Sequence, residues 1–157
     1  MMRQIQKEDN QSLALIIRQS LKSYGLDKPG TVYTDPTTDD LFKLFQTVGS
    51  VYFVALEDEK ILGGCGIFPT QGLPSGHAEL VKLYLSEDAR GKGLGKLLME
   101  TASAWAKDYG YTHLYLETFR ELDSAVHLYK KLGYQDLFHP LGDSGHHACE
   151  VWMLKTL

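Results

Sequence analysis

The feature that most constrains this chain is a glycine-rich turn at residues 91–95, with a glycine at every second position. The segment before it, residues 79–85, alternates apolar and polar side chains with the period of two that is typical of a strand. After the turn, apolar residues recur at helical spacing from Leu94 to Ala106, and Gly110 supplies a stop. The sequence therefore predicts a strand, a tight turn and a helix in succession.

This turn has the composition of an anion site. Backbone amides at a helix start can converge on phosphate oxygens where no side chain holds the ligand away, and alternate glycines provide that access. Arg90, Lys92 and Lys96 add positive charge beside the positive end of the helix dipole. We therefore predict that the turn binds a pyrophosphate or a similar anion.

Two well-known phosphate loops do not fit the spacing. A Walker loop requires glycine where Arg90 stands and Ser or Thr where Leu97 stands. The dinucleotide fingerprint places its third glycine three residues after its second, whereas Gly95 follows Gly93 by two. Glu117, at the end of the next predicted strand, imitates the ribose-binding acid of that fingerprint, so a nucleotide-binding domain stays open as an alternative.

Two segments resemble a known family. Arg90, Gly93 and Gly95 match the pattern Arg/Gln-x-x-Gly-x-Gly/Ala, and this segment resembles the acyl-CoA-binding motif of the GCN5-related N-acetyltransferase (GNAT) family. Residues 125–134 are similar to the family's Ala-x-x-Leu-Tyr-x-x-x-Gly-Phe signature. The resemblance runs from about Val51 to the C-terminus and implies acetyl-CoA as co-substrate.

The resemblance and the element pattern predict one N-acetyltransferase domain over residues 1–157. The fold class expected is α/β: a mixed, mostly antiparallel sheet of about seven strands with a central parallel pair, flanked by four helices. Besides the central unit, we expect a short strand at Ile5, helices at 10–24, from Leu41 to Val48 and from Ala125 to Leu132, and strands at 51–56, 61–68, 112–118, 134–138 and 149–154.

Composition narrows the partners and the compartment. A net charge of −4 and a pI near 5.8 argue against a nucleic-acid or anionic-membrane binder. Cys65 and Cys149 are too few for a disulfide framework and lack metal-ligand spacing. The N-terminus shows no apolar signal region, and no run approaches the ~20 apolar residues of a membrane span. We expect a cytoplasmic protein, with sheet edges that leave room for a homodimer.

The family resemblance assigns residues to the CoA site. It implies that the backbone of the central strand pairs with the pantetheine arm and that the turn holds the pyrophosphate. Many relatives carry an asparagine where this chain has Leu122, so we expect Thr118 or Ser124 to replace its contact. The other predicted CoA-binding residues are Leu83, Tyr84, Leu85, Arg90, Gly91, Lys92, Gly93, Leu94, Gly95 and Lys96.

Glu79 is the candidate general base. Acyl transfer to an amine requires one, because an ammonium has no lone pair. Glu79 lies eleven residues before Arg90, where many family members carry a glutamate, and we expect it to share the strand face of Val81 and Leu83. Partial burial there raises a carboxyl pKa toward the useful range. The alternative is an ordinary strand-edge glutamate, solvated or paired with Lys82.

Tyr129 is the candidate acid. It matches the family's tyrosine that approaches the thioester sulfur, and the alternative is a core tyrosine on the apolar helix face. Cys65 lies among glycines with no basic partner, so no cysteine acyl-enzyme is expected. The predicted function is transfer of an acetyl group from acetyl-CoA to a primary amine by direct attack. The alternative is a non-catalytic acyl-CoA-binding module or sensor.

Two loops are the candidate acceptor site. In the family, the loop after the first helix and the loop between the last two strands commonly border the acceptor, which implies roles for Tyr33, Asp35, His146 and His147. Adjacent histidines on an extended chain point apart and no fourth ligand is apparent, so we expect no metal. The acidic composition favours a cationic amine, borne by a small molecule or a peptide.

Overall fold

The computed structural model describes all 157 residues and contains seven strands and four α-helices. None of the helices has the combination of length and apolar character needed to cross a membrane. The strands are β1 (Met2–Gln4), β2 (Val51–Glu57), β3 (Lys60–Phe68), β4 (His77–Leu85), β5 (His113–Thr118), β6 (Gln135–Leu137) and β7 (Val151–Thr156), and the helices are α1 (Asn10–Ser23), α2 (Leu41–Leu44), α3 (Leu94–Tyr109) and α4 (Asp123–Lys131).

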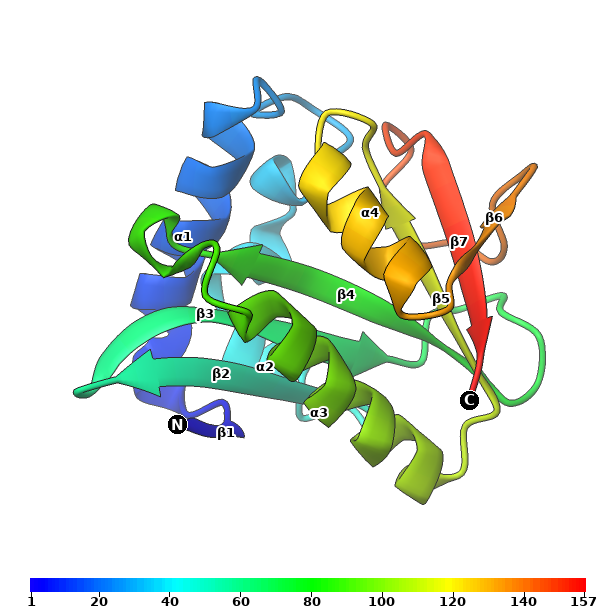
Figure 1. The fold of residues 1–157 in the computed structure, drawn as a ribbon, viewed down its shortest axis with the longest axis horizontal. Helices are drawn as coiled ribbons and strands as arrows, with labels where there is room; N and C mark the ends of the chain where they lie inside the picture. Colours follow the sequence, from blue (N-terminus) through cyan, green and yellow to red (C-terminus); the bar gives the residue numbers. More distant parts are fainter.

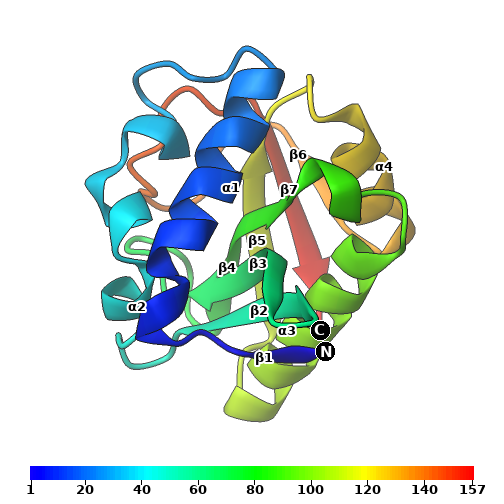
Figure 2. The same ribbon diagram turned by 90° about the vertical axis from the view of Figure 1, so that its left-hand side faces the viewer.

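The strands form a single sheet in the order β1-β2-β3-β4-β5-β7-β6. Every neighbouring pair is antiparallel except β4 and β5, which lie side by side at the centre and are parallel. Helices α1 and α2 cover one face of the sheet, and α3 and α4 cover the other (Figures 1 and 2). The predicted α/β architecture, with its central parallel pair and four helices, is confirmed.

The segment between α1 and α2 is more structured than a loop, and α2 is shorter than expected. Two 3₁₀ turns, Val32–Thr34 and Pro36–Asp39, follow α1. We expected the next helix to reach Val48, but α2 ends at Leu44 and the Val48 side chain is 85% exposed. The Thr47 hydroxyl donates to the carbonyl oxygen of Leu44 at 2.8 Å, so a turn replaces the next helical hydrogen bonds.

The buried face of α3 differs by one residue from the expected face. Leu97 was expected in the apolar stripe but is 49% exposed, whereas Met99 is fully buried. Small side chains at Ala102 and Ala106, both fully buried, let α3 pack closely against the sheet. Met99 therefore belongs to the buried face of α3, and Leu97 does not.

β4 contains a bulge at Lys82. Gly64 of β3 pairs with Tyr84, but Gly66 pairs with Val81, so two residues of β4 lie opposite one residue of β3. Lys82 has a φ of 52°, in the left-handed region that side chains rarely adopt. A bulge of this kind bends the strand and redirects the side chains that follow it.

The bulge reverses the alternation of side chains along β4. Val81 packs with the residues under α1, whereas Leu83 and Leu85 pack with those under α3. The expectation that Glu79 shares a face with both Val81 and Leu83 is therefore wrong: Glu79 shares one with Val81 only. One extra residue is enough to move all the following side chains to the opposite face, because the side-chain period of a strand is two.

The central parallel strands separate soon after they pair. Residues 77–79 of β4 pair with residues 113–115 of β5, and no pairing follows although both strands continue. Beyond this point β4 stays hydrogen-bonded to β3 and β5 to β7. A wedge therefore opens between the C-terminal parts of β4 and β5.

Candidate active site

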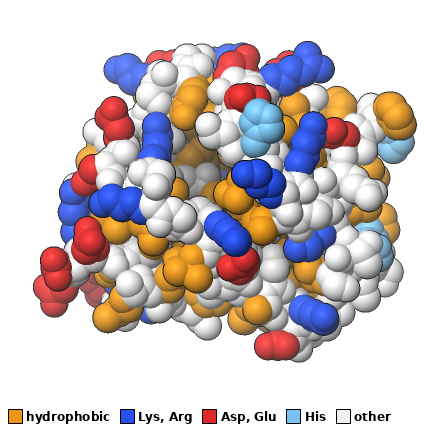
Figure 3. Space-filling view, in the orientation of Figure 1, with side chains coloured by type: hydrophobic (Ala, Val, Ile, Leu, Met, Phe, Trp, Pro, Cys, Tyr) orange, Lys and Arg blue, Asp and Glu red, His pale blue; other side chains and the backbone are white.

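A groove of about 400 Å³ lies between the glycine turn, the end of β4 and the start of α4. Figure 3 shows the hollow on this face of the molecule, with apolar side chains at its floor and Lys and Arg side chains around it. Of the predicted CoA-binding residues, the groove is lined by Leu83, Tyr84, Leu85, Arg90, Gly91, Gly93, Leu94, Gly95, Lys96 and Ser124.

The glycine turn exposes backbone amides to this groove. Gly91 and Gly93 have φ of 76° and 77°, and a Cβ built on either would meet no atom within 4 Å. The amide of Leu97 makes a helical hydrogen bond of 3.2 Å to the Gly93 carbonyl, so the three amides before it, at 94–96, precede the helical ladder. Free amides and open space at a helix start fit a phosphate group.

Arg90 fixes the turn against α1. Its Nη2 donates a hydrogen bond of 2.9 Å to Oγ of Ser20, a buried residue of α1, and its guanidinium lies 5.6 Å from the ring centroid of Tyr24. Ser20 and Tyr24 also line the groove. Neither was expected from the sequence, because both lie some 70 residues from the turn in a helix that carried no recognised motif.

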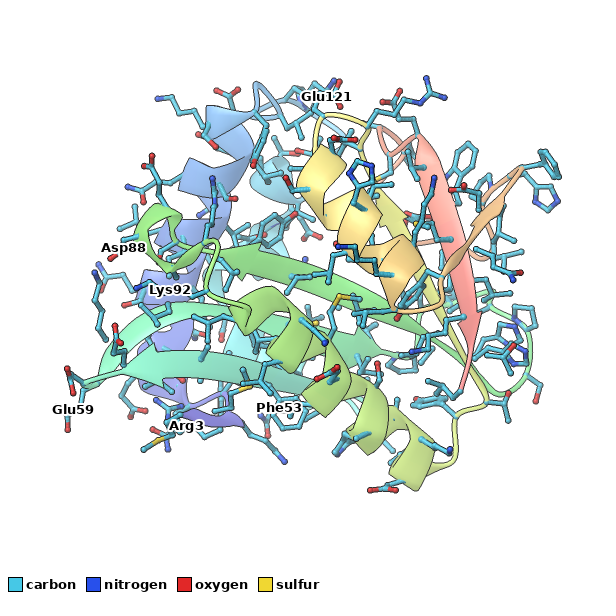
Figure 4. All side chains as sticks on the ribbon, in the orientation of Figure 1. Arg3, Phe53, Glu59, Asp88, Lys92 and Glu121 are labelled. Carbon is cyan, nitrogen blue, oxygen red and sulfur yellow. The ribbon has the colours of Figure 1, made fainter.

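Two predicted CoA-binding residues lie away from the groove. Lys92 lies on the outer side of the turn, toward the β2–β3 hairpin, beside Met1 and Leu56 (Figure 4). Thr118 is buried and lines a second, smaller cavity. Of the two substitutes proposed for the missing asparagine, only Ser124 borders the groove.

The second cavity, of about 60 Å³, lies in the wedge between β4 and β5. Its walls are mostly apolar, and its charged or polar side chains come from both strands and from the β6–β7 loop. Leu83, Tyr84, Leu122 and Tyr129 line both this cavity and the groove, so the two spaces adjoin. We call this space the inner cavity.

Glu79 lies in the inner cavity and is only 3% exposed. The hydroxyl of Thr70 donates a hydrogen bond of 2.6 Å to Oε1 of this carboxyl. Burial raises the pKa of Glu79 to about 7, and the charge of Glu117 acts in the same direction, against the Thr70 hydrogen bond and the charge of Lys82. Glu79 is therefore not a solvated glutamate, and it changes protonation near neutral pH.

Glu117 is a second carboxylate of the inner cavity, and the sequence analysis did not assign it to this site. Tyr115 donates a hydrogen bond of 2.6 Å to Oε2, and the Ser144 hydroxyl donates to Oε1. The amide of Leu141 in turn donates to the Tyr115 hydroxyl at 3.1 Å. One feature of the sequence did point to this position: the predicted parallel pairing of β4 and β5 brings Glu117 close to Glu79.

A hydrogen bond between side chains joins the two predicted acceptor loops. Nε2 of His146 lies 2.9 Å from Oδ2 of Asp35. The hydrogen bond with His146 holds the pKa of Asp35 well below its usual range, helped by Thr37. His146 lines the inner cavity, and His147 lines a hollow that adjoins it. Tyr33 lines neither space.

Tyr129 is buried at the junction of the two spaces. It is 6% exposed, and burial raises the pKa of its hydroxyl far above neutrality, so the hydroxyl stays protonated. Cys149 also lines the inner cavity, and burial, followed by the charges of Glu117 and Glu79, raises its pKa to about 12. Burial likewise raises the pKa of Cys65. Both cysteines are thiols near neutral pH and are poor nucleophiles.

Comparison with known proteins identifies relatives by sequence. The family model described as "Acetyltransferase (GNAT) family" matches residues 17–134. The N-acetyltransferase YjgM of Escherichia coli K12 is 40% identical over 99% of this chain and 94% of that protein. Human N-acetyltransferase 8B is 34% identical over 71% of this chain, which corresponds to 54% of its own length.

Solved structures share the fold at low sequence identity. A GNAT-family acetyltransferase of Staphylococcus aureus Mu50 has a TM-score of 0.84 at 16% identity, covering 100% of this chain and 98% of its own. A phosphinothricin acetyltransferase of Sinorhizobium meliloti, in complex with AcCoA, has a TM-score of 0.78 at 21% identity, covering 100% and 88%. PaiA N-acetyltransferase of Thermoplasma acidophilum, in complex with coenzyme A, has a TM-score of 0.73 at 18% identity, covering 100% and 98%.

Proposed function

The chain belongs to the acetyltransferase (GNAT) family, and from this premise we propose that it moves the acetyl group of acetyl-CoA to a primary amine by direct attack. The observation that carries the proposal is the contact between the two spaces. A groove bordered by the start of α3 and by Arg90 and Lys96 adjoins a buried cavity that contains Glu79, whose pKa burial raises to about 7. Acetyl-CoA supplies the activated thioester, and the chain's own residues position it and move protons.

The residues of the groove fit an extended molecule with a pyrophosphate. The amides at residues 94–96, with Arg90 and Lys96, suit the pyrophosphate. The edge of β4 that faces the wedge has no strand partner beyond Glu79, so its backbone groups near Tyr84 are free to bind the amides of a pantetheine arm. The arm would then end where Tyr129 separates the groove from the inner cavity.

Glu79 is proposed as the base. An acceptor amine enters as an ammonium, and Glu117 attracts it toward the wedge by charge. Because the pKa of Glu79 is about 7, the carboxylate form is available at and above neutral pH to take the proton. The hydrogen bond from the Thr70 hydroxyl keeps the Glu79 carboxyl oriented during this proton transfer.

Tyr129 is proposed as the acid that protonates the departing thiolate. Its hydroxyl is protonated over the whole working range, and its position at the junction gives it access to both spaces. Tyr129→Phe keeps the ring packing and removes the proton. We expect the turnover rate to fall by about 10²-fold or more, while binding of acetyl-CoA changes little.

The test is release of free CoA thiol from acetyl-CoA with a broad panel of primary amines, with the acetylated product confirmed by mass spectrometry. Wild-type protein is compared with Glu79→Gln and with Glu121→Gln, an exposed glutamate near the start of α4 (Figure 4). Amine-dependent release that is lost only in Glu79→Gln supports the proposal. Tight acetyl-CoA binding without release for any amine would instead support the non-catalytic acyl-CoA-binding module.

A further inference from the structure

Lys82 is a buried lysine that the proposed chemistry does not use. It is the bulge residue of β4, its side chain is 4% exposed, and it lines the inner cavity together with Glu79, Glu117 and His146. Lysine is rarely buried without a partner, because removing an ammonium from water is costly. Its position inside this cavity therefore requires an explanation.

The protein itself leaves the Lys82 ammonium without a hydrogen bond. The nearest carboxylate oxygen is Oδ2 of Asp35, at 3.9 Å, which is an ion-pair distance and too long for a hydrogen bond. Oδ2 of Asp35 already lies 2.9 Å from Nε2 of His146, within hydrogen-bond distance. Oδ1 of Asp35 accepts hydrogen bonds from the amide and the hydroxyl of Thr37, at 2.9 and 2.7 Å. Lys82 therefore has one ion-pair partner and no hydrogen bond within the chain, and it lines the inner cavity.

The inner cavity has two ends of opposite charge. Glu79 and Glu117 place carboxylates at the wedge between the strands, where the amine must meet the thioester. Lys82 places a positive charge on the same strand, three residues further along and across the bulge. Asp35 is also held by His146 and Thr37, so Lys82 is the cationic side chain of this end that makes no hydrogen bond within the chain.

We propose that the Lys82 ammonium binds the carboxylate of the acceptor, and that the acceptor is an amino acid. The inference rests on the proposed function, because it assigns a ligand to the acceptor side of the same site. A molecule with an ammonium and a carboxylate close together matches the two ends, and a cavity of about 60 Å³ admits only a compact polar head group. An amine without an anionic group leaves the Lys82 ammonium without a hydrogen bond, which disfavours its binding.

The test compares matched acceptors that differ in one group. Glycine, L-alanine, L-methionine and L-aspartate are each assayed against the corresponding α-carboxamide, with thiol release as the readout. A carboxamide amine is less basic than that of the free acid and is more readily deprotonated. A preference for the free acid therefore reports recognition of the carboxylate and not reactivity of the amine.

The variants are Lys82→Met, which keeps the length of the side chain and removes its charge, and Lys131→Met, an exposed lysine of α4, as control. We expect the wild type to favour at least one acid over its amide by about tenfold or more in kcat/KM, chiefly through KM. Lys82→Met should lower kcat/KM for the acid about tenfold more than for the amide, because loss of the charge near Glu79 acts on both substrates and cancels in this ratio. If Lys82→Met does not fold, Lys82→Gln takes its place.

The outcomes separate this inference from the proposed function. Equal use of acids and amides by the wild type, or an equal loss for both in Lys82→Met, contradicts the role of Lys82 while acetyl transfer stands. Absence of thiol release with every amine contradicts acetyl transfer itself. Calorimetric titration of the amino acid into the CoA-bound protein then decides the rest: Lys82-dependent binding supports the carboxylate site, and no binding overturns it.

Discussion

The hydroxyl of Tyr52 donates a hydrogen bond of 2.9 Å to the carbonyl oxygen of Lys82, the bulge residue of the central strand. Tyr52 is 1% exposed, and Lys82 lies where the register between β3 and β4 shifts. Tyr52 therefore donates a hydrogen bond to a buried backbone carbonyl at the bulge, where the alternation of side chains along β4 is reversed. It links a core residue of β2 to the geometry of the inner cavity.

Tyr52→Phe should destabilise the protein, because it leaves a buried carbonyl unsatisfied. We expect a loss of about 1–3 kcal/mol in the free energy of unfolding. Chemical denaturation monitored by fluorescence or circular dichroism measures it. Tyr109→Phe is the matched control, because Tyr109 is 50% exposed and its hydroxyl makes no hydrogen bond within the chain. A loss equal to that of the control would show that the Tyr52 hydroxyl does not support the bulge.

Gly93→Ala and Gly93→Glu should weaken the binding of acetyl-CoA in that order. The alanine adds a methyl group to the turn that lines the groove, and the glutamate adds a negative charge where a phosphate is expected. Calorimetry measures the affinity. Gly110→Ala is the control: Gly110 also has a positive φ, 117°, with open space around it, but lies at the far end of α3. Equal losses in the Gly93 and Gly110 variants would mean that backbone strain alone is responsible.

Asp35→Asn should remove a contribution to stability that depends on pH in a defined direction. The folded-state pKa of Asp35 is lowered by His146, so its contribution is present above the ordinary carboxyl pKa, about 3.9, and is lost as the pH falls below it. The melting temperatures of wild type and variant should differ most above about pH 5 and converge in acid. A difference that stays constant down to acid pH, or that matches exposed Asp108→Asn, contradicts the pairing.

Glu79→Gln should stabilise the protein at high pH while it removes the proposed base. The folded-state pKa of Glu79, about 7, is higher than the ordinary value of 4.5, so the wild type loses stability as the pH rises from 4.5 through 7. Glutamine does not titrate, so the variant keeps this stability. The wild type's loss in the free energy of unfolding is on the order of 3 kcal/mol at most. Thermal melts across this range measure it. A variant that is no more stable than wild type at pH 8 would mean that burial does not disfavour the ionised carboxylate of Glu79.

Local sequence patterns predicted most of the fold. The strand, glycine turn and helix of residues 79–109, the hairpin after residue 51 and the helix that carries Tyr129 all have strong periodicity and clear stops, and these elements are confirmed. The errors come from tertiary packing. At the bulge, Gly64 of β3 leaves room for the Tyr52 ring, whose hydroxyl bonds the Lys82 carbonyl, since a Cβ on Gly64 would lie 2.3 Å from Cε1 of Tyr52. No local sequence pattern in β4 predicts the bulge.

The site was predictable where its residues belong to a motif and not where they meet through the fold. Arg90, the glycines and Tyr129 were found from motifs that resemble those of the family, and the structure places them around one groove. Glu117 and Lys82 enter the inner cavity through strand separation and a bulge, which are set by pairing between distant segments. Ser20 reaches the groove only because α1 packs against the turn.

The most direct test of acetyl transfer through Glu79 is the pH dependence of kcat/KM, measured by thiol release for wild type and Glu79→Gln with one acceptor whose amine titrates well above neutral pH. We expect a wild-type rate that rises through about pH 7, and a variant that loses this rise and is slower by about 10²-fold or more. A variant that keeps the same rise and nearly the same rate would contradict it, and Glu79 would no longer be the base.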